Sequence, residues 1–371
     1  MLDPFPFPAP LVLQQAIRPF ADYFCLTTLP LHIHEVFFFA FFYQVINAYL
    51  SPPLSRALFP RAYAALNRRS RINWDVHVVS LLQSLLVCGT ALWVIWCDEE
   101  RGEMNWRGRI WGYTGAGGFL QAMAAGYFLW DLVVSTVHFG VFGAGLWAHA
   151  VAALTVFSLG FRPFVNFYGP IFILYELSSP FLNIHWFLDK LSLTGSNLQL
   201  INGIFLTTTF FFCRLFWGAY SSWRVFGDIY RAMVVQGVLY GTAAPGGAVV
   251  GGAVVGGAPA DYGPKSDIMA FVPPEAERLV PVWLAAAYMG ANLVLNALNY
   301  YWFSRMIQTI RARFEPPLGT KGVGKGGSKG EEKGAGRGER GEQPMMARGV
   351  YADGRKTVEV EKREVRTRRR G

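Results

Sequence analysis

Charged residues are scarce in this chain of 371 residues. Only 16% are Asp, Glu, Lys or Arg, whereas 52% are hydrophobic, and the mean hydropathy is +0.26. Soluble domains usually carry about 25% charged residues, so the composition excludes an ordinary soluble protein and predicts an all-α integral membrane protein. Most of the formal net charge of +9 comes from the segment beyond Pro316. The basicity therefore describes a tail, and we expect no nucleic-acid partner.

Cysteines and catalytic motifs are also sparse. The four cysteines show neither a CxxC pair nor a regular spacing, so no disulfide framework is expected. No GxGxxG, GxxxxGKS/T, HExxH or GxSxG motif lies in a context that suits it. The six histidines form no HxxxH or HxxHH box, the pattern that di-iron membrane hydroxylases use. We therefore expect neither a metal site nor a bound cofactor.

Long hydrophobic runs, in contrast, are abundant. A membrane crossing needs about 20 mostly apolar residues, and the sequence predicts seven of them: Leu31–Leu50, Trp74–Cys97, Gly118–His138, Phe142–Gly160, Phe164–Phe187, Leu198–Trp217 and Val280–Phe303. The first begins with His32, His34 and Glu35, and the fifth contains Pro170 and Pro180. Either of these two is a candidate for a partial or re-entrant segment.

The segments around these runs give the predicted organisation. Residues 1–30 form a proline-rich N-terminal segment, 31–72 hold the first crossing and a basic loop, and 73–314 form the main membrane domain. Within that domain, the Gly/Ala-rich residues 241–264 predict a flexible loop rather than an eighth crossing. Residues 315–371 predict a disordered basic tail that is either solvated or held to anionic lipid.

Charge asymmetry between the loops predicts the orientation. The loop after the first crossing is rich in arginine, whereas the loop after the second begins with Asp98, Glu99 and Glu100. By the positive-inside rule the N-terminus is lumenal or external and the tail is cytoplasmic. Seven crossings agree with this, because an odd number places the two ends on opposite sides. Arg214, near the predicted end of the sixth crossing, is expected to extend its side chain to the membrane interface.

Polar side chains in the third and fourth crossings are the first functional candidates. Asp131, Ser135 and His138 are spaced i, i+4 and i+7, so they share one helix face, which Tyr127 extends by a turn. Asp131 and His138 either join helices or supply a catalytic carboxylate and imidazole. His149 stands among alanines, which permit either close helix packing or space for a ligand.

The fifth and second crossings hold further polar residues. Glu176 and Asn183 are seven positions apart with Pro180 between them. This arrangement suits either a polar pocket near mid-membrane or a capped proline kink. His185 follows in the same segment, and His77 leads a one-sided polar set in the second crossing.

A family resemblance is carried by five segments. They are NWDVHVVSLLQS (73–84), GYFLWDL (126–132), HAVAAL (149–154), ELSSPFLNIHWFLDK (176–190) and NLVLNALNYYWFSRMI (292–307). Together they resemble the TLC-domain superfamily, whose best-known enzymes are the ceramide synthases. The likeness is greatest to the small eukaryotic TLC-domain-containing proteins of fungal type.

The resemblance implies a helical barrel that encloses a lipid-sized cavity in the endoplasmic reticulum membrane. Ceramide synthases carry a His-His doublet, which corresponds here to Ala148 and His149, so only its second histidine is present. The Asp-rich segment that follows the doublet in those enzymes is replaced here by Glu176 to Asn183.

Two functions of different class follow from these features. We favour a protein of lipid homeostasis that binds or senses a membrane lipid in a polar cavity lined by His77, Tyr127, Ser135, Glu176, Asn183 and His185. The alternative is a ceramide-synthase-like N-acyltransferase with acyl-CoA as co-substrate and a catalytic set of His149, Asp131 and His138. A lipid transporter or cargo receptor is a further alternative, which no internal repeat supports.

Overall fold

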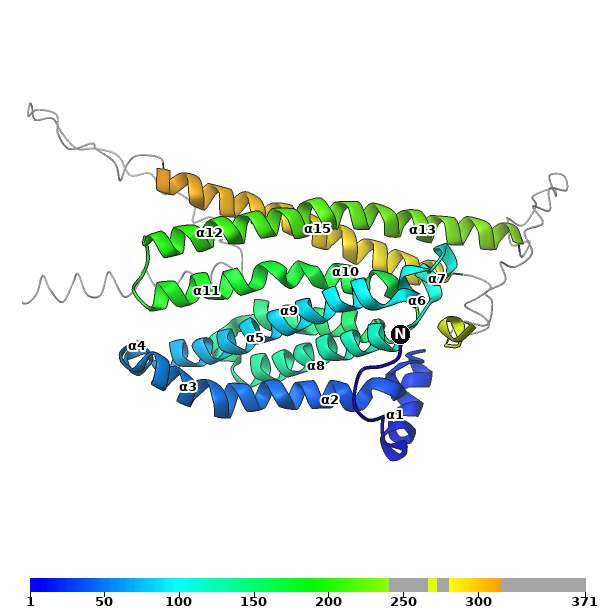
Figure 1. Ribbon diagram of the computed structural model, residues 1–371, viewed down its shortest axis with the longest axis horizontal. Helices are drawn as coiled ribbons and strands as arrows, with labels where there is room; N and C mark the ends of the chain where they lie inside the picture. The colour runs from blue at the N-terminus through cyan, green and yellow to red at the C-terminus, as the bar shows by residue number, and fades with distance from the viewer. Residues whose placement is uncertain (240–265, 272–279, 315–371) are drawn as a thin grey trace, which may run out of the picture.

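The predicted all-α architecture is confirmed by the computed structural model, which describes residues 1–239, 266–271 and 280–314. No strand occurs within these three ranges. Figure 1 shows long helices that lie side by side along a common direction. The predictions for residues 241–264 and 315–371 lie outside the described residues.

The first helices form one corner of the bundle. α1 (Leu11–Tyr23) follows Pro10, and α2 (Leu29–Val45) carries Pro30 in its first turn, where the N–H that proline lacks is not needed. A short π-helix and the helices α3 and α4 come next, with bounds Ile46–Leu50, Ser51–Leu58 and Pro60–Ala65. α1 therefore adds a helix within the segment that the sequence indicated as proline-rich.

Side-chain caps start the next four helices. These helices are α5, α6, α7 and α8, with bounds Arg68–Cys97, Glu99–Gly102, Trp106–Trp111 and Gly115–Val137. In each, the residue before the helix accepts a hydrogen bond from a first-turn backbone N–H, and these residues are Asn67, Asp98, Asn105 and Thr114. The starts of these helices are thus encoded by local sequence.

The next part of the chain is irregular. α9 (Phe139–Leu159) is kinked at Gly143, whose φ of 76° favours glycine. The chain then forms η2, α10, η3 and α11, with bounds Asn166–Tyr168, Gly169–Ile173, Leu174–Ser178 and Ser179–Lys190. Pro170 and Pro180 each stand in the first turn of a new helix, so the fifth predicted crossing is a succession of short helices.

The last described helices are long. α12 (Asn197–Phe210), the π-helix η4 (Phe211–Phe216) and α13 (Trp217–Leu239) follow one another without a break. α15 (Val282–Phe314) packs against η4 and α13, and the short η5 (Ser266–Met269) lies against α7. The sixth predicted crossing lies within this continuous helical stretch, which extends beyond Trp217 to Leu239.

Small residues bring α2 and α8 into close contact. Ala122 and Ala125 of α8 are buried in the same apolar cluster as Val36 of α2. A Cβ atom added to Gly126 would lie 2.7 Å from both the Cβ of Phe39 and the carbonyl oxygen of Val36. Glycine is thus required for the observed separation of these two helices.

Five described helical stretches are long and apolar enough to cross a membrane. They are Leu29–Leu58, Arg68–Cys97, Trp106–Val137, Phe139–Leu159 and Asn197–Val234. They correspond to five of the seven predicted crossings and support a membrane protein. The other two predicted crossings correspond to the broken segment from α10 to α11 and to α15, so a count of seven stays a prediction.

Candidate functional site

A histidine and an asparagine join α5 to α11. Nδ1 of His77 lies 2.7 Å from Oδ1 of Asn183, and the amide oxygen accepts this hydrogen bond. The imidazole also stacks on the indole ring of Trp186, with 4.0 Å between ring centroids. Asn183 is only 2% exposed. The pair therefore fixes the packing of the two helices from inside the bundle.

The amide nitrogen of Asn183 makes two further contacts. It donates to Oγ of Ser80 at 3.1 Å and to the backbone oxygen of Ser179 at 3.0 Å. One asparagine side chain thus uses its acceptor and its amide group across to α5, and the amide group also donates within α11. Interhelical hydrogen bonds of this kind contribute about 1 kcal/mol each in membrane proteins.

A carboxylate and a guanidinium extend this arrangement toward η4. Oγ of Ser179 donates to Oε2 of Glu176 at 2.6 Å, and Nη2 of Arg214 lies 3.8 Å from Oε1 of the same carboxylate. We call these six residues the polar network: His77, Ser80, Glu176, Ser179, Asn183 and Arg214. It connects α5, η3, α11 and η4 in one continuous set of polar contacts.

Arg214 lies inside the bundle, so its expected position at the membrane interface is wrong. Its Nε donates to the backbone oxygen of Tyr175 at 2.9 Å and to Oγ of Ser178 at 3.2 Å. The 3₁₀ geometry of η3 presents that carbonyl group, and the π-helix η4 carries the arginine toward it. The side chain reaches protein partners instead of the interface because the helix continues well past it.

Tyr127 borders the polar network from α8. Its hydroxyl interacts with the side chain of Ser80, and it lies within electrostatic range of Asp131 and Glu176. Asp131 is half-buried on the same helix. The structure thus places four of the six predicted cavity residues in or beside the polar network: His77, Tyr127, Glu176 and Asn183.

The other two predicted cavity residues lie elsewhere. Ser135 is 3% exposed on α8, two turns beyond Tyr127. His185 is two positions after Asn183 on α11 and faces α12, since a Cβ atom at Gly203 would lie 3.9 Å from its Cε1.

The three predicted catalytic residues do not form one hydrogen-bonded set. His138 follows the last residue of α8 and has φ −109° and ψ 35°, which are not helical values. Its side chain therefore does not continue the helix face that carries Asp131. His149 is exposed on α9 and lies within electrostatic range of Glu176 and Arg214. Within the described ranges no hydrogen bond links Asp131 to either histidine.

Three members of the polar network are not among the candidate residues predicted from the sequence: Ser80, Ser179 and Arg214. Ser80 belongs to the one-sided polar set that His77 leads, and Arg214 is predicted to lie at the membrane interface. An arginine in the apolar run FFFCRLFW was a signal, because an intramembrane charge usually has a partner in the protein interior.

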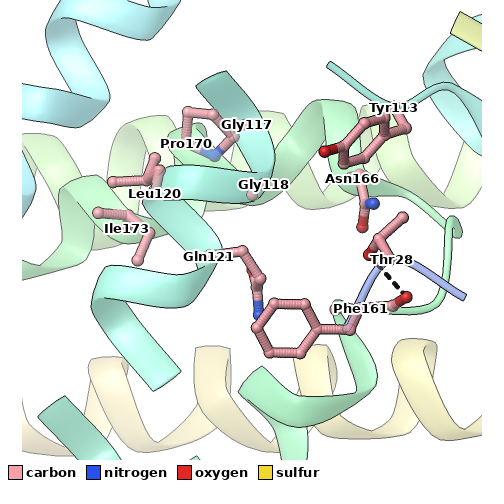
Figure 2. Close-up of a pocket in the computed structure, with 12 residues that line it drawn as sticks. Thr28, Tyr113, Gly117, Gly118, Leu120, Gln121, Phe161, Asn166, Pro170 and Ile173 are labelled. Atoms are coloured by element: carbon pink, nitrogen blue, oxygen red, sulfur yellow. Dashed lines mark hydrogen bonds between the residues drawn. The ribbon is translucent and has the colours of Figure 1, made fainter. Parts of the chain in front are cut away.

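A small pocket near the start of α8 is lined by none of the polar-network residues. Figure 2 shows it between the start of α8, represented by Gly118 and Gln121, and the segment that carries Phe161 and Asn166. Its volume is about 10 Å³, which suits about one water molecule. Thr28 closes one side and donates to the backbone oxygen of Phe161 at 2.8 Å. A lipid-sized cavity therefore stays a prediction.

Buried polar groups also hold the loops at the two ends of the bundle. The hydroxyl of Tyr63 donates to Asp75 at 3.0 Å, and burial together with this carboxylate raises the pKa of Tyr63 to about 12. At the other end Arg101 donates to the backbone oxygen of Phe167 at 2.8 Å, and burial lowers its pKa to about 10. Near neutral pH the phenol stays protonated and the guanidinium stays charged.

Asp3, His32 and Glu35 are the residues that could hold a metal ion within the described part of the chain. They meet at the start of α2, away from the polar network. No metal site is predicted from the sequence, because its histidines form no HxxxH or HxxHH box.

Comparison with known sequences identifies the family. Residues 73–308 match the model of the TLC domain. An uncharacterized TLC domain-containing protein of Schizosaccharomyces pombe is 37% identical over 305 residues, covering 82% of this chain and 87% of the relative. Topoisomerase I damage affected protein 4 of Saccharomyces cerevisiae is 25% identical, covering 77% and 86%. TLC domain-containing protein 4 of Homo sapiens is 30% identical, covering 51% and 70%. The polar network lies wholly within the matched residues.

Proposed function

The chain belongs to the TLC-domain family, and from that premise we propose that it binds a membrane lipid through the polar network and thereby acts in lipid homeostasis. Glu176 carries the proposal. Its side chain lies among candidate membrane-spanning helices, is 33% exposed, and is held by Ser179 and Arg214. A carboxylate at membrane depth costs roughly 2.5 kcal/mol or more unless it has polar partners. Its accessible oxygen surface is thus suited to the polar group of a lipid.

The surroundings of Glu176 favour a headgroup that donates hydrogen bonds. Both carboxylate oxygens accept, and one of them is already used by Ser179. Arg214 balances the negative charge from the protein side. His149, exposed on α9 and within electrostatic range of Glu176, adds an imidazole that both donates and accepts. An amine or hydroxyl headgroup would fit this set.

Binding is favoured over acyl transfer by the position of the predicted catalytic residues. A general base needs a partner that orients it, usually within hydrogen-bond distance. Asp131, the expected partner, is joined to neither His138 nor His149 within the described ranges. The acidic group within electrostatic range of His149 is Glu176, which is already held by Ser179 and Arg214.

We place this function in the endoplasmic reticulum membrane, with the C-terminal tail in the cytoplasm. The family resemblance supports the compartment, and the arginine-rich first loop supports the orientation. The basic tail is proposed to contact anionic lipid of the cytoplasmic leaflet. Fluorescence microscopy of a tagged chain beside an endoplasmic-reticulum marker tests the location.

Lipidomic rescue tests the function. Cells that lack the protein are complemented with wild type, Glu176→Gln or Ser135→Ala at matched expression levels. Ser135→Ala is the control, because this residue is buried on α8 outside the polar network. We expect wild type and Ser135→Ala to restore the lipid profile and Glu176→Gln to leave it at the level of the deletion.

Equal rescue by Glu176→Gln would show that its carboxylate serves packing only and would overturn the proposal. A His149→Ala variant separates the two functions. Complete loss of one acyl-lipid class, with lipid binding retained by the purified variant, would support acyl transfer instead.

A further inference from the structure

Three metal-type ligands meet where α2 begins. Nδ1 of His32 lies 2.9 Å from Oε1 of Glu35 and 3.3 Å from Oδ2 of Asp3. Ligand atoms from all three residues lie within 4.8 Å of one another. Zn²⁺ binds nitrogen and oxygen ligands at about 2.0–2.2 Å, which places ligand atoms around a tetrahedral ion roughly 3.3 Å apart. Small movements of these side chains would therefore allow all three to bind one ion.

Among the described residues no lysine or arginine side chain balances the charge at this point. The basic side chains beside Glu35 are His32 and His34, and Nε2 of His34 lies 3.7 Å from Oε1 of Glu35. The side chains of His32 and Glu35 are both 0% exposed, and that of Asp3 is 31% exposed. Within the described ranges no Lys or Arg forms an ion pair with either carboxylate. Two neighbouring carboxylates, of which that of Glu35 is fully buried, require protons or a cation to offset their charge. One divalent cation neutralises both.

The surroundings of His32 suit a metal-binding imidazole. Its Nε2 lies 2.6 Å from the hydroxyl of Tyr113. Metal-binding histidines commonly donate their second ring N–H to an oxygen, which fixes the tautomer and orients the ring. In that tautomer the lone pair of Nδ1 faces the carboxylates of Asp3 and Glu35, and an ion between the three groups removes the repulsion.

A glycine makes room for the same ring. A Cβ atom at Gly118 would lie 2.2 Å from Nε2 of His32. Any side chain at position 118 would therefore collide with the imidazole. Tyr113 lies just before α8, and Gly118 lies in its first turn. The pocket for the imidazole is therefore built by a second part of the chain.

We propose that Asp3, His32 and Glu35 bind a divalent transition-metal ion, with Zn²⁺ the best match to one imidazole nitrogen and two carboxylate oxygens. The ion joins the N-terminal segment to α2. The partial exposure of Asp3 provides access from the end of the bundle, and three protein ligands leave one position for water. The site lies outside residues 73–308 and is independent of the proposed lipid function.

Metal analysis of the purified full-length chain tests this site. The protein carries an affinity tag without histidine, is incubated with zinc sulfate in detergent and is then dialysed. Mass spectrometry of the metal content should give about one Zn²⁺ per chain for wild type. Asp3→Asn and His32→Gln should each lower it at least tenfold. Asp22→Asn, an exposed acidic residue of α1, and His138→Gln are the matched controls and should retain it.

Melting temperatures test the metal site independently of variants that fold poorly. Asp3 lies in the N-terminal segment and is partly exposed, so Asp3→Asn is the variant expected to fold normally. Zn²⁺ should raise the melting temperature of wild type and EDTA should reverse this, whereas Asp3→Asn should respond to neither. Wild type with less than about a tenth of an equivalent of zinc, or Asp3→Asn with as much zinc as wild type, would overturn the proposal.

Discussion

Asn183 illustrates how single side chains position the candidate site. Its amide accepts from His77 and donates to Ser80 and to the backbone of Ser179. Asn183 itself is buried, whereas His77 and Ser80 are half-buried. The local sequence also allowed a simpler explanation, a capped proline kink next to Pro180. The contacts across to α5 support a role in joining helices as well.

We expect Asn183→Leu to lower the free energy of unfolding by about 1–3 kcal/mol, because it removes the partners of buried donors and acceptors. Scanning fluorimetry in detergent measures the change. A double-mutant cycle with His77→Phe measures the interaction energy of the pair. The double variant should lose less free energy of unfolding than the sum of the losses in the two single variants. Strictly additive losses would show that His77 and Asn183 do not interact in the folded protein.

At the same scale, residue identity alone indicated part of the polar network. Glu176, Asn183 and His77 are unusual in apolar runs, and the structure brings them together. Arg214 is predicted to lie at the interface because it stands near the predicted end of the sixth crossing, whereas its side chain has protein partners inside the bundle. Asp3 carries no signal in the sequence, since its link to His32 depends on how the N-terminal segment folds back on α2.

At the scale of elements, close approach of α2 and α8 holds the N-terminal part of the bundle together. The approach depends on small side chains in α8, and Gly126 lies so close to Val36 and Phe39 of α2 that a Cβ atom would not fit. Overpacking such a contact forces backbones apart and commonly costs about 1–3 kcal/mol.

Gly126→Ala should therefore destabilise the protein by about that amount, although alanine is the better helix former. Gly89→Ala is the matched control, because a Cβ atom there would have no neighbour within 4 Å. Its expected effect is neutral or stabilising by up to about 1 kcal/mol. The melting temperatures of the two purified variants measure the difference. Equal melting temperatures would contradict the view that the close approach of α2 and α8 at Gly126 stabilises the fold.

Helix positions were largely predictable, whereas irregular backbone was not. The apolar runs located α5, α8 and α9 within a few residues, and the prolines indicated the interrupted fifth crossing. The π-helix η4 has no sequence signal of its own. Its position depends on tertiary contacts with η3 and α15, and these contacts cannot be predicted from the spacing of hydrophobic residues along the sequence.

At the scale of the whole molecule, the two ends of the bundle differ in charge. Figure 1 shows α3, α4 and the last turns of α15 at one end, with α1, α6 and α7 at the other. The arginine-rich first loop thus shares an end with the start of the basic tail, as the orientation prediction requires. The acidic residues after α5 are at the opposite end.

Cysteine labelling tests the orientation. Cys97 is exposed at the end of α5, and Ala57 is exposed on α3 at the other end. In sealed microsomes, an impermeant maleimide should label a single-cysteine variant with Ala57→Cys at once. A variant that keeps only Cys97 should react only after the membrane is opened. The reverse pattern would place the basic loop in the lumen.

Photo-crosslinking of lipid to the polar network tests the central claim most directly. The purified chain is placed in vesicles that contain a phospholipid with a diazirine near its headgroup, and cross-linked peptides are mapped by mass spectrometry. We predict cross-links on α9 near His149 and on η3 near Glu176, reduced at least fivefold by Glu176→Gln and unchanged by Ser135→Ala. Cross-links spread evenly over the membrane-facing surface, with no effect of Glu176→Gln, would contradict a lipid site at the polar network.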